Sequence, residues 1–546
     1  MDNTARDSSV AQLAVDTIRA AGIDTLFCLP GVQNDEFFDA LVDARDIRPI
    51  VARHEQGAAY MALGASQATG RPAACCVVPG PGLLNAASGL TSAYWAGGRV
   101  LALVGAIPHP LKGKGVGVLH ELPDQTAVLE QVTKHAAYIS SGEEAVAVAQ
   151  GVLESLLANE GRPVSLEVPV NVWGQFIDGV LEAPVRSTPT IDPVALERAA
   201  NAIAGAERPV IIVGSGAYEA GDQVRALAEL LQAPVFTRRQ GHGVIDSRHP
   251  LWVPLPVGRD LWGEADVAIG IGTRLEFPIL HWGTDDGLQI VQINIDEAEL
   301  DRHDLGTIGV HGDATTALDG LLEALVGHEP STADRPTDLA KRRSAFAAEI
   351  AHLEPQLSHL AAIRQALPDD GIIVEDVTQL TFAAHFAFEF RHPRTMLTSG
   401  AAGTLGAAVA QAIGAQVAVP DRRVLAIVGD GGFLFTATEL ATAVKYNVPV
   451  TVLVHDNSAY GNVKRIQQER FGPDRTIASD LVNPDLLAFG ESFGVHSQRA
   501  ESADELREAL ERAFAHDGPS LVVVPMGEVP SPWPWIVMAK NRGADS

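Results

Sequence analysis

The chain has 546 residues, of which 46% are hydrophobic and 20% charged, a length and composition that suit about three α/β domains. Its formal net charge of −28 argues against nucleic acid or an anionic membrane surface as the main partner. We expect a cytoplasmic protein, because no apolar run could span a membrane, no signal peptide is visible, and Cys28, Cys75 and Cys76 form no disulfide framework.

The N-terminal third alternates predicted helices with short apolar strands. The expected helices are 10–21 and 54–69, and the expected strands are 25–29, 50–52, 73–78 and 100–104. Such a rhythm is typical of a parallel sheet with helices on both faces. We therefore expect an α/β domain over residues 1–183, followed by a proline-rich linker at 184–193.

The rest of the chain repeats this rhythm. Further strands are expected at 209–213, 267–271 and 290–295, and a further helix at 357–367. The strands predict a central Rossmann-like domain over 190–330, and a second linker near 327–336 precedes a third domain over 350–546. The predicted fold class is α/β, with three domains that each contain a mostly parallel sheet flanked by helices.

Two apolar runs in the third domain end in polar residues. Residues 424–428 precede Gly429-Asp430-Gly431-Gly432, residues 450–454 precede His455-Asp456-Asn457, and a helix is expected between them at 436–446. A right-handed crossover places both strand ends at one edge of the sheet, where α/β proteins bind ligands. The Asp430 carboxylate and the Asn457 amide suit Mg²⁺, and the glycines let backbone N–H groups approach an anion. These residues predict a Mg²⁺-bound diphosphate.

The same residues resemble the fingerprint of thiamine-diphosphate-dependent enzymes, and the likeness is closest to the acetolactate-synthase-like group. Asp456 stands where the family usually has a first Asn, but the metal-ligating second position is kept as Asn457. The resemblance implies thiamine diphosphate and Mg²⁺ as cofactors, with Asp430, Asn457 and the main-chain carbonyl of Ala459 as metal ligands. The segment that follows would add cofactor contacts from Tyr460, Gly461 and Asn462.

A second motif, Arg53-His54-Glu55-Gln56, opens a predicted helix after a strand. Taken alone, Glu55 is most simply a first-turn acid that complements the helix dipole. The motif also resembles the family's N-terminal one, whose Glu contacts N1′ of the thiamine pyrimidine and promotes loss of the thiazolium C2 proton. Because both motifs occur in the family's order, we expect Glu55 to be catalytic.

Three further segments resemble cofactor-binding parts of acetolactate synthases. Residues 79–85 match the glycine-rich turn beside the pyrimidine, which implies contacts from Pro81 and Asn85. Residues 399–406 match the Gly-Thr-Met-Gly segment, so the Gly403 carbonyl would accept from the 4′-amino group and Leu405 would replace Met as the apolar wedge. Residues 376–379 match a loop that contacts the diphosphate, with Thr378 and Gln379 as the candidate residues.

The substrate side departs from the acetolactate synthases. Ile466 takes the place of their Trp in the helix after the metal site. Gln33, His120 and Glu121 would make the pocket more polar and better able to relay protons, although each is equally well read as an ordinary surface residue. We include these three with Glu55 as candidate catalytic residues.

The central domain also departs from the pattern. The Arg-Phe-Asp-Asp-Arg segment associated with flavin binding reads Thr273-Arg274-Leu275-Glu276-Phe277-Pro278, and the preceding loop is reduced to Gln240-Gly241-His242-Gly243. A lone Gly214-Ser215-Gly216 is weak support for a nucleotide. We therefore expect no FAD.

The family's architecture implies a homodimer or homotetramer with active sites between chains, because the pyrimidine-binding domain of one chain faces the diphosphate-binding domain of another. We expect decarboxylation of a 2-oxo acid, with or without acyloin-type ligation to a second carbonyl. One alternative is a 2-hydroxyacyl-CoA lyase or oxalyl-CoA-type decarboxylase, which the run 121–125 loosely suggests. Another is a catalytically silent cofactor-binding oligomer, which would have no need of Glu55.

Overall fold

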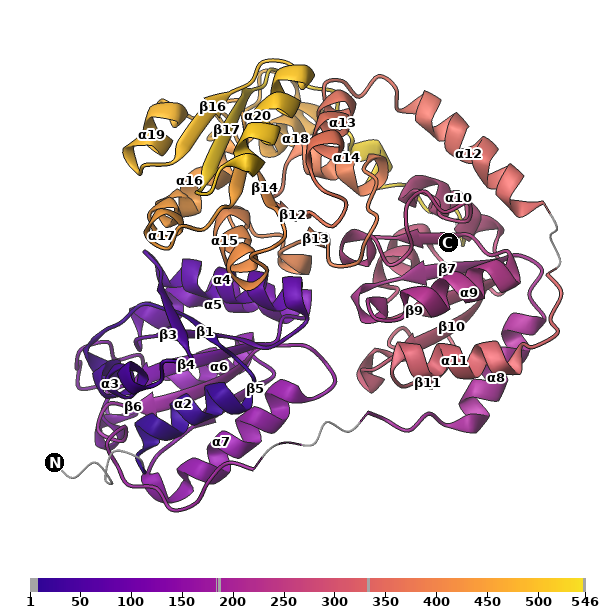
Figure 1. Cartoon of the computed structure of the whole chain (residues 1–546). Helices are drawn as coiled ribbons and strands as arrows, with labels where there is room; N and C mark the ends of the chain where they lie inside the picture. Colours follow the sequence, from indigo (N-terminus) through magenta and orange to yellow (C-terminus); the bar gives the residue numbers. More distant parts are fainter. Residues whose placement is uncertain (1–7, 183, 185–187, 331–333, 544–546) are drawn as a thin grey trace.

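The computed structural model describes residues 8–182, 184, 188–330 and 334–543, and Figure 1 shows them as three α/β units. Each unit contains one β-sheet, and the neighbouring strands in all three sheets are parallel. The predicted fold class is confirmed. Within these ranges, no helix is both long and apolar enough to cross a membrane.

The first unit contains a six-stranded sheet. Its strands are β1 (Thr25–Cys28), β2 (Arg48–Val51), β3 (Ala73–Val77), β4 (Val100–Ala106), β5 (His135–Tyr138) and β6 (Val164–Pro169), in the order β2-β1-β3-β4-β6-β5. Its helices are α2 (Val10–Ala20), α3 (Asp35–Asp43), α4 (Glu55–Thr69), α5 (Pro81–Ala96), α6 (Gln125–Val132) and α7 (Gly142–Leu157). The fully buried β3 and β4 are the apolar runs that the sequence predicts as strands.

The central unit contains a five-stranded sheet. Its strands are β7 (Pro209–Val213), β8 (Val235–Thr237), β9 (Val267–Ile271), β10 (Gln289–Asn294) and β11 (Ile308–His311), in the order β11-β10-β9-β7-β8. The flanking helices are α8 (Pro193–Ala204), α9 (Gly221–Leu231), α10 (Leu255–Glu264) and α11 (Ala314–Ala324). Parts of both predicted linkers, residues 185–187 and 331–333, lie outside the described residues.

Helix α12 (Arg335–Glu349) connects the central unit to the third one (Figure 1). It includes Arg335 and Pro336, the last two residues of the linker predicted near 327–336. Pro336 lies in the first turn of the helix, where its missing N–H would have had no intrahelical partner. A proline read as a linker residue is therefore part of a helix start.

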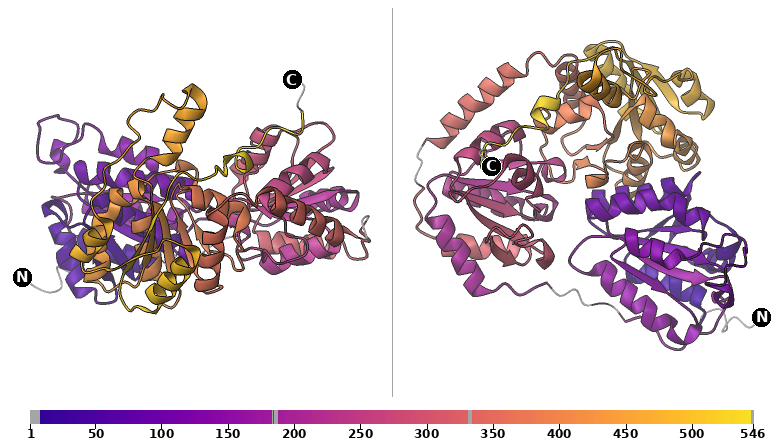
Figure 2. Two further views of the ribbon diagram at one scale, coloured as in Figure 1. Left: turned by 90° about the horizontal axis from the view of Figure 1, so that it is seen from above. Right: turned by 180° about the vertical axis from the view of Figure 1, so that it is seen from behind.

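The third unit contains another six-stranded sheet. Its strands are β12 (Ile372–Glu375), β13 (Met396–Leu397), β14 (Val424–Gly429), β15 (Thr451–Asp456), β16 (His496–Arg499) and β17 (Ser520–Pro525), in the order β13-β12-β14-β15-β17-β16. Its helices are α13 (Gln356–Ala366), α14 (Gln379–Ala387), α15 (Ala408–Ala418), α16 (Asp430–Thr436), α17 (Leu440–Lys445), α18 (Gly461–Phe471), α19 (Leu486–Ser492) and α20 (Ala503–Ala515). Beyond β17, the chain returns to the central unit (Figure 2), where Arg542 donates to the Trp262 carbonyl at 2.7 Å.

The segment between β14 and β15 corrects one prediction. A single helix was expected at 436–446, but helix α16 already begins at Asp430 and a 3-10 turn, η8 (Ala437–Glu439), separates it from α17. The sequence did not predict this helix start, because two glycines in a first turn make a helix less stable. Burial of Phe433, whose side chain is 0% exposed, offsets that cost.

The first and third units share one continuous hydrophobic core, in which α4 packs on α15 (Figure 1). The helices approach closely, because a side-chain carbon on Gly64 or Gly414 would overlap the backbone carbonyl of Gln411 or Met61 respectively. Gln411 also donates to the Gln67 side chain across the same contact. This packing sets the start of α4 against the third unit.

Candidate active site

Glu55 is the first residue of α4, just beyond the carboxyl end of β2. His54 caps the helix, because its Nδ1 accepts from the Gln56 N–H at 3.1 Å. The Glu55 side chain is 9% exposed, and its Oε2 accepts from Asn85 Nδ2 at 3.0 Å. Asn85 lies on α5, which begins at Pro81. The structure thus brings two of the predicted site residues, Glu55 and Asn85, into direct contact, and this contact uses only one oxygen of the Glu55 carboxylate.

Asp430 and Asn457 follow β14 and β15, which are neighbours in the third sheet. Asp430 is 1% exposed, and its Oδ1 accepts from the Asn457 N–H at 3.4 Å. Burial raises the pKa of Asp430, whereas a hydrogen bond from Asn483 lowers it. Ala459 lies in the turn after β15 and pairs with Asp480 in an isolated bridge. The Asp430 carboxylate thus contacts the backbone at Asn457, two residues before Ala459.

This donor set suits Mg²⁺, which takes a few hard protein oxygens and completes its octahedron with phosphate and water. Among the described residues, no group of three or more His, Cys, Asp or Glu could hold a metal ion by itself. A metal at Asp430 would therefore depend on oxygens of another kind, which the Asn457 amide, the Ala459 carbonyl and a diphosphate would supply.

Asn483 is a site residue that the sequence did not reveal. Its Nδ2 donates to Asp430 Oδ2 at 2.7 Å and to Asp456 Oδ1 at 3.0 Å, so it orients both carboxylates. It lies in the irregular segment before α19, where neither a strand end nor a motif draws attention to it.

The glycines around Asp430 occupy places where a side chain would not fit. A side-chain carbon on Gly431 would lie 2.6 Å from the Tyr460 ring, and one on Gly432 would lie 2.5 Å from Asp376 Oδ2. A side-chain carbon on Gly461 would lie 2.5 Å from Asn457 Nδ2. Glycine is therefore required at these positions by the packing of Tyr460, Asp376 and Asn457 against the backbone.

Asp376 ties this region to the Gly403–Gly406 segment. Its Oδ2 accepts from the Gly406 N–H at 2.7 Å, and burial raises its pKa to about 6. Gly403 has a φ of 57° in the left-handed region, which glycine adopts readily, and it is exposed, so its carbonyl is accessible. Leu405 lies beside Gly432. The segment predicted to meet the pyrimidine thus adjoins the segment predicted to meet the diphosphate.

Thr378 and Gln379 begin helix α14. The Thr378 hydroxyl caps the helix by accepting from the Thr381 N–H at 3.1 Å. Gln379 Nε2 donates to Asn462 Oδ1 at 3.4 Å, whereas its Oε1 is buried and has no hydrogen-bond partner among the described residues. An unpartnered buried oxygen is costly. Its presence beside Asn462 fits a site that a ligand or its water completes.

The three residues predicted for substrate chemistry lie in the first unit. Gln33 is 6% exposed in the turn after β1, and its Oε1 is buried without a partner within the described chain. His120 has a left-handed φ of 66°, and its carbonyl lies against Gly80. The Glu121 carboxylate accepts from the Gly117 N–H at 2.6 Å and the Val118 N–H at 3.0 Å. The Glu121 carboxylate thus bonds to the backbone of its own loop. Its role in proton transfer stays a prediction.

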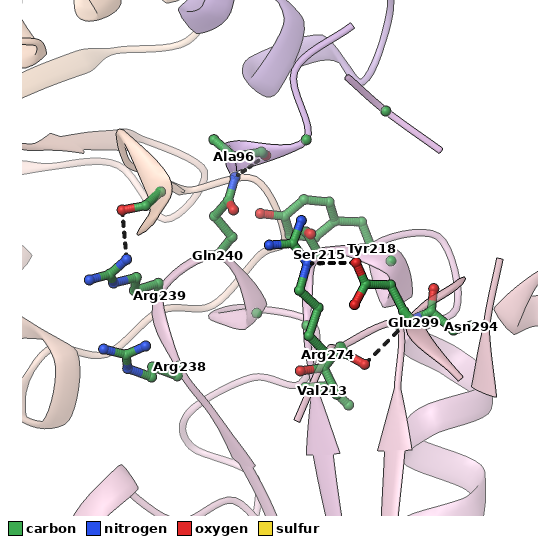
Figure 3. A pocket seen from close by; sticks show the side chains of 18 of the residues that line it. Ala96, Val213, Ser215, Tyr218, Arg238, Arg239, Gln240, Arg274, Asn294 and Glu299 are labelled. Atoms are coloured by element: carbon green, nitrogen blue, oxygen red, sulfur yellow. Dashed lines mark hydrogen bonds and ion pairs between the residues drawn. The ribbon is translucent and has the colours of Figure 1, made fainter. Parts of the chain in front are cut away.

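A pocket of about 420 Å³ lies at the carboxyl edge of the central sheet, where all three units meet (Figure 3). Glu299 lies in it and pairs with Arg274 at 3.4 Å and Arg162 at 3.3 Å. Arg239 donates to the Gly400 carbonyl at 2.6 Å and so joins the central and third units. The lining contains none of the residues predicted to bind the cofactor or the metal.

A buried carboxylate at a helix start beside one parallel sheet, and Mg²⁺-type ligands in a glycine-rich segment at the end of another, are typical of α/β enzymes that use thiamine diphosphate. Family models of the N-terminal, central and C-terminal domains of thiamine pyrophosphate enzymes match residues 8–128, 196–321 and 376–524. The chain belongs to the thiamine pyrophosphate enzyme family, in its acetolactate-synthase-like group.

Curated relatives cover nearly the whole chain. A probable 2-ketoarginine decarboxylase of Pseudomonas aeruginosa is 33% identical over 94% of this chain and 93% of its own length. A probable acetolactate synthase large subunit of Methanocaldococcus jannaschii is 31% identical over 94% of this chain and 91% of its own. The acetolactate synthase isozyme 2 large subunit of Escherichia coli is 28% identical over 96% and 97%. These relatives identify a carboligase or decarboxylase type of enzyme and no single substrate.

Proposed function

We propose that this thiamine-diphosphate enzyme decarboxylates a 2-oxo acid, with ligation to a second carbonyl as a further step when an acceptor is present. Bound thiamine diphosphate supplies a carbon nucleophile that also accepts electrons during decarboxylation. The pairing of Glu55, the first residue of α4, with Asn85, in the second turn of α5, carries the proposal, because a buried and oriented carboxylate of this kind is suited to exchange a proton with a ring nitrogen.

We assign the diphosphate and Mg²⁺ to the third unit. Asp430, Asn457 and the Ala459 carbonyl would hold the metal, and Gly429, Gly431, Gly432 and Gln379 would lie along the diphosphate. The space beside Gly429, where an added side-chain carbon would meet only the Thr378 side chain at 3.8 Å, and the unpartnered Gln379 oxygen support this assignment. Pro81, Gly403, Leu405, Tyr460, Gly461 and Asn462 complete the proposed cofactor contacts.

We also propose a homodimer or homotetramer with active sites between chains. Large apolar side chains beside the candidate residues support it: Leu84 precedes Asn85 and is 50% exposed, while Leu434 and Phe435 on α16 are 37% and 52% exposed. Exposed apolar groups on two separate units are typical of surfaces that a partner covers. The free, buried cysteines suit the cytoplasm that we propose for this protein.

The purified protein is expected to contain no FAD. Glu299 places a carboxylate in the central pocket and already pairs with Arg274, so this arginine is not free for a nucleotide phosphate. The measurement is the visible absorption spectrum after release of any bound chromophore by heat, with an acetolactate synthase that holds flavin as the control. One flavin per chain would contradict the prediction.

The experiment that tests the proposed reaction is a screen of 2-oxo acids with product identification. Protein, Mg²⁺ and thiamine diphosphate are incubated with pyruvate, 2-ketoarginine and branched or aromatic 2-oxo acids, with and without a second carbonyl compound. CO₂ release together with an aldehyde or an acyloin supports the proposal. Turnover of 2-hydroxyacyl-CoA or oxalyl-CoA, with no turnover of any 2-oxo acid, would replace it by the coenzyme A alternative.

A further inference from the structure

Glu439 is a fully buried carboxylate that reaches from the third unit to the segment just before Glu55. It ends the turn η8, and its side chain is 0% exposed. Its Oε1 accepts from the Arg53 N–H and the His54 N–H, each at 3.0 Å. Its Oε2 accepts from the Thr442 hydroxyl at 2.6 Å. A buried charge is tolerated only when it is satisfied in this way.

Two neighbouring contacts hold the same segment. The Val51 N–H donates to the Tyr446 hydroxyl at 2.9 Å. Tyr446 directly follows α17, so this part of the third unit is bonded to the end of β2. A side-chain carbon on Gly57 would overlap Glu439 Oε1, which shows that the first turn of α4 rests directly on this carboxylate. The backbone on both sides of Glu55 is thus fixed by the third unit of the same chain.

We infer that Glu439 is a positioning residue for Glu55: it fixes the backbone from which Glu55 projects, while Asn85 orients the Glu55 carboxylate. The inference rests on the proposed role of Glu55. It also gives the contact between η8 and the start of α4 a catalytic purpose, because a displacement of about 1 Å in a catalytic group lowers a rate about 100-fold. A domain contact within one chain would then set the geometry of the acid–base group.

The test compares Glu439→Ala, Glu439→Gln and wild type as full-length protein. The first readout is amide hydrogen exchange of residues 51–57 in the cofactor-free protein. The second is the rate of hydrogen exchange at C2 of bound thiamine diphosphate in D₂O, measured by NMR after acid quench. The third is the dissociation constant of thiamine diphosphate with Mg²⁺.

The Ala variant is expected to exchange amides 51–57 faster and to slow C2 exchange about 100-fold, with the cofactor dissociation constant changed less than about threefold. Glutamine keeps one acceptor oxygen toward the two N–H groups, so it should restore C2 exchange to within about tenfold of wild type. Gln411→Met is the matched control, because it removes a buried polar side chain that bonds to Gln67 near the other end of α4. It should lower the melting temperature and leave C2 exchange unchanged.

A folded Ala variant with wild-type C2 exchange, or with unchanged amide protection of residues 51–57, would overturn the inference. If that variant does not fold, Tyr446→Phe decides, because it removes the acceptor of the Val51 N–H. Slower C2 exchange and weaker protection of the segment are then expected, and unchanged values overturn the inference. A wild-type protein that shows no C2 exchange at all would refute the proposed function. The amide measurement on cofactor-free protein would still show whether Glu439 holds residues 51–57 in place.

Discussion

Replacing Glu55 by Gln is expected to lower kcat by about 100- to 10,000-fold, the usual contribution of a positioned acid–base group. Glutamine keeps the size of the side chain and an oxygen for Asn85, whose Nδ2 donates to Glu55 at 3.0 Å. It cannot carry a proton to or from the cofactor. Steady-state decarboxylation and C2 exchange measure the loss, and the dissociation constant of thiamine diphosphate should change little.

Glu143→Gln is the matched control for this variant. Glu143 is also an acid in the first turn of a helix, α7, but it is exposed. If Glu55 only complemented the helix dipole, both variants would lose a few tenths of a kcal/mol of stability and both would keep full activity. Full activity in the Glu55 variant would refute its catalytic role.

Replacing Asp430 by Asn should remove Mg²⁺-dependent cofactor binding. Asp430 is the one carboxylate in the proposed metal set, so we expect its loss to raise the thiamine diphosphate dissociation constant by about 100-fold or more. Residues that only contact the metal ligands usually change metal affinity by about 10- to 100-fold. Burial raises the pKa of this group, so the cofactor-free protein should not become less stable when the charge is removed. Titration calorimetry and thermal melts with and without cofactor measure both effects.

In the wild type, cofactor at 100 times its dissociation constant should stabilise the protein by about 2.7 kcal/mol, and the same concentration should stabilise the Asp430 variant by about 0.4 kcal/mol or less. Asp456→Asn is the control, because Asp456 shares the Asn483 donor with Asp430. That change gives the residue which the family usually has there, so binding should stay within a few-fold of wild type. An Asp430 variant that binds the cofactor normally would contradict the assignment of the metal site.

The elements that position the candidate site were predictable where burial dictates composition. Strand β14 must be apolar because both of its faces are covered, and the change to Gly429 and Asp430 marks its end at the ligand-binding edge of the sheet. Helix α16 was not predictable in this way, because Gly431 and Gly432 are poor helix residues and the packing of Phe433 decides the outcome.

Contacts between distant segments were beyond sequence reasoning. Arg53 and Glu439 are 386 residues apart in the chain, and Asp430 and Asn483 are 53 apart. An isolated Glu or Asn in a turn carries no periodicity or spacing that marks it as a partner. The motif at Glu55 shows where the carboxylate lies, whereas only the fold shows what holds it there.

The most direct test of a shared active site combines the two inactive variants. Glu55→Gln and Asp430→Asn chains carrying different tags are co-expressed, and the hybrid is purified by both tags in turn. If each site takes Glu55 from one chain and Asp430 from another, a hybrid dimer contains one doubly altered site and one intact site. It should then show about half of the wild-type decarboxylation rate, while both homodimers remain inactive. A pure hybrid as inactive as its parents would contradict the proposal that Glu55 and Asp430 of different chains act on one cofactor.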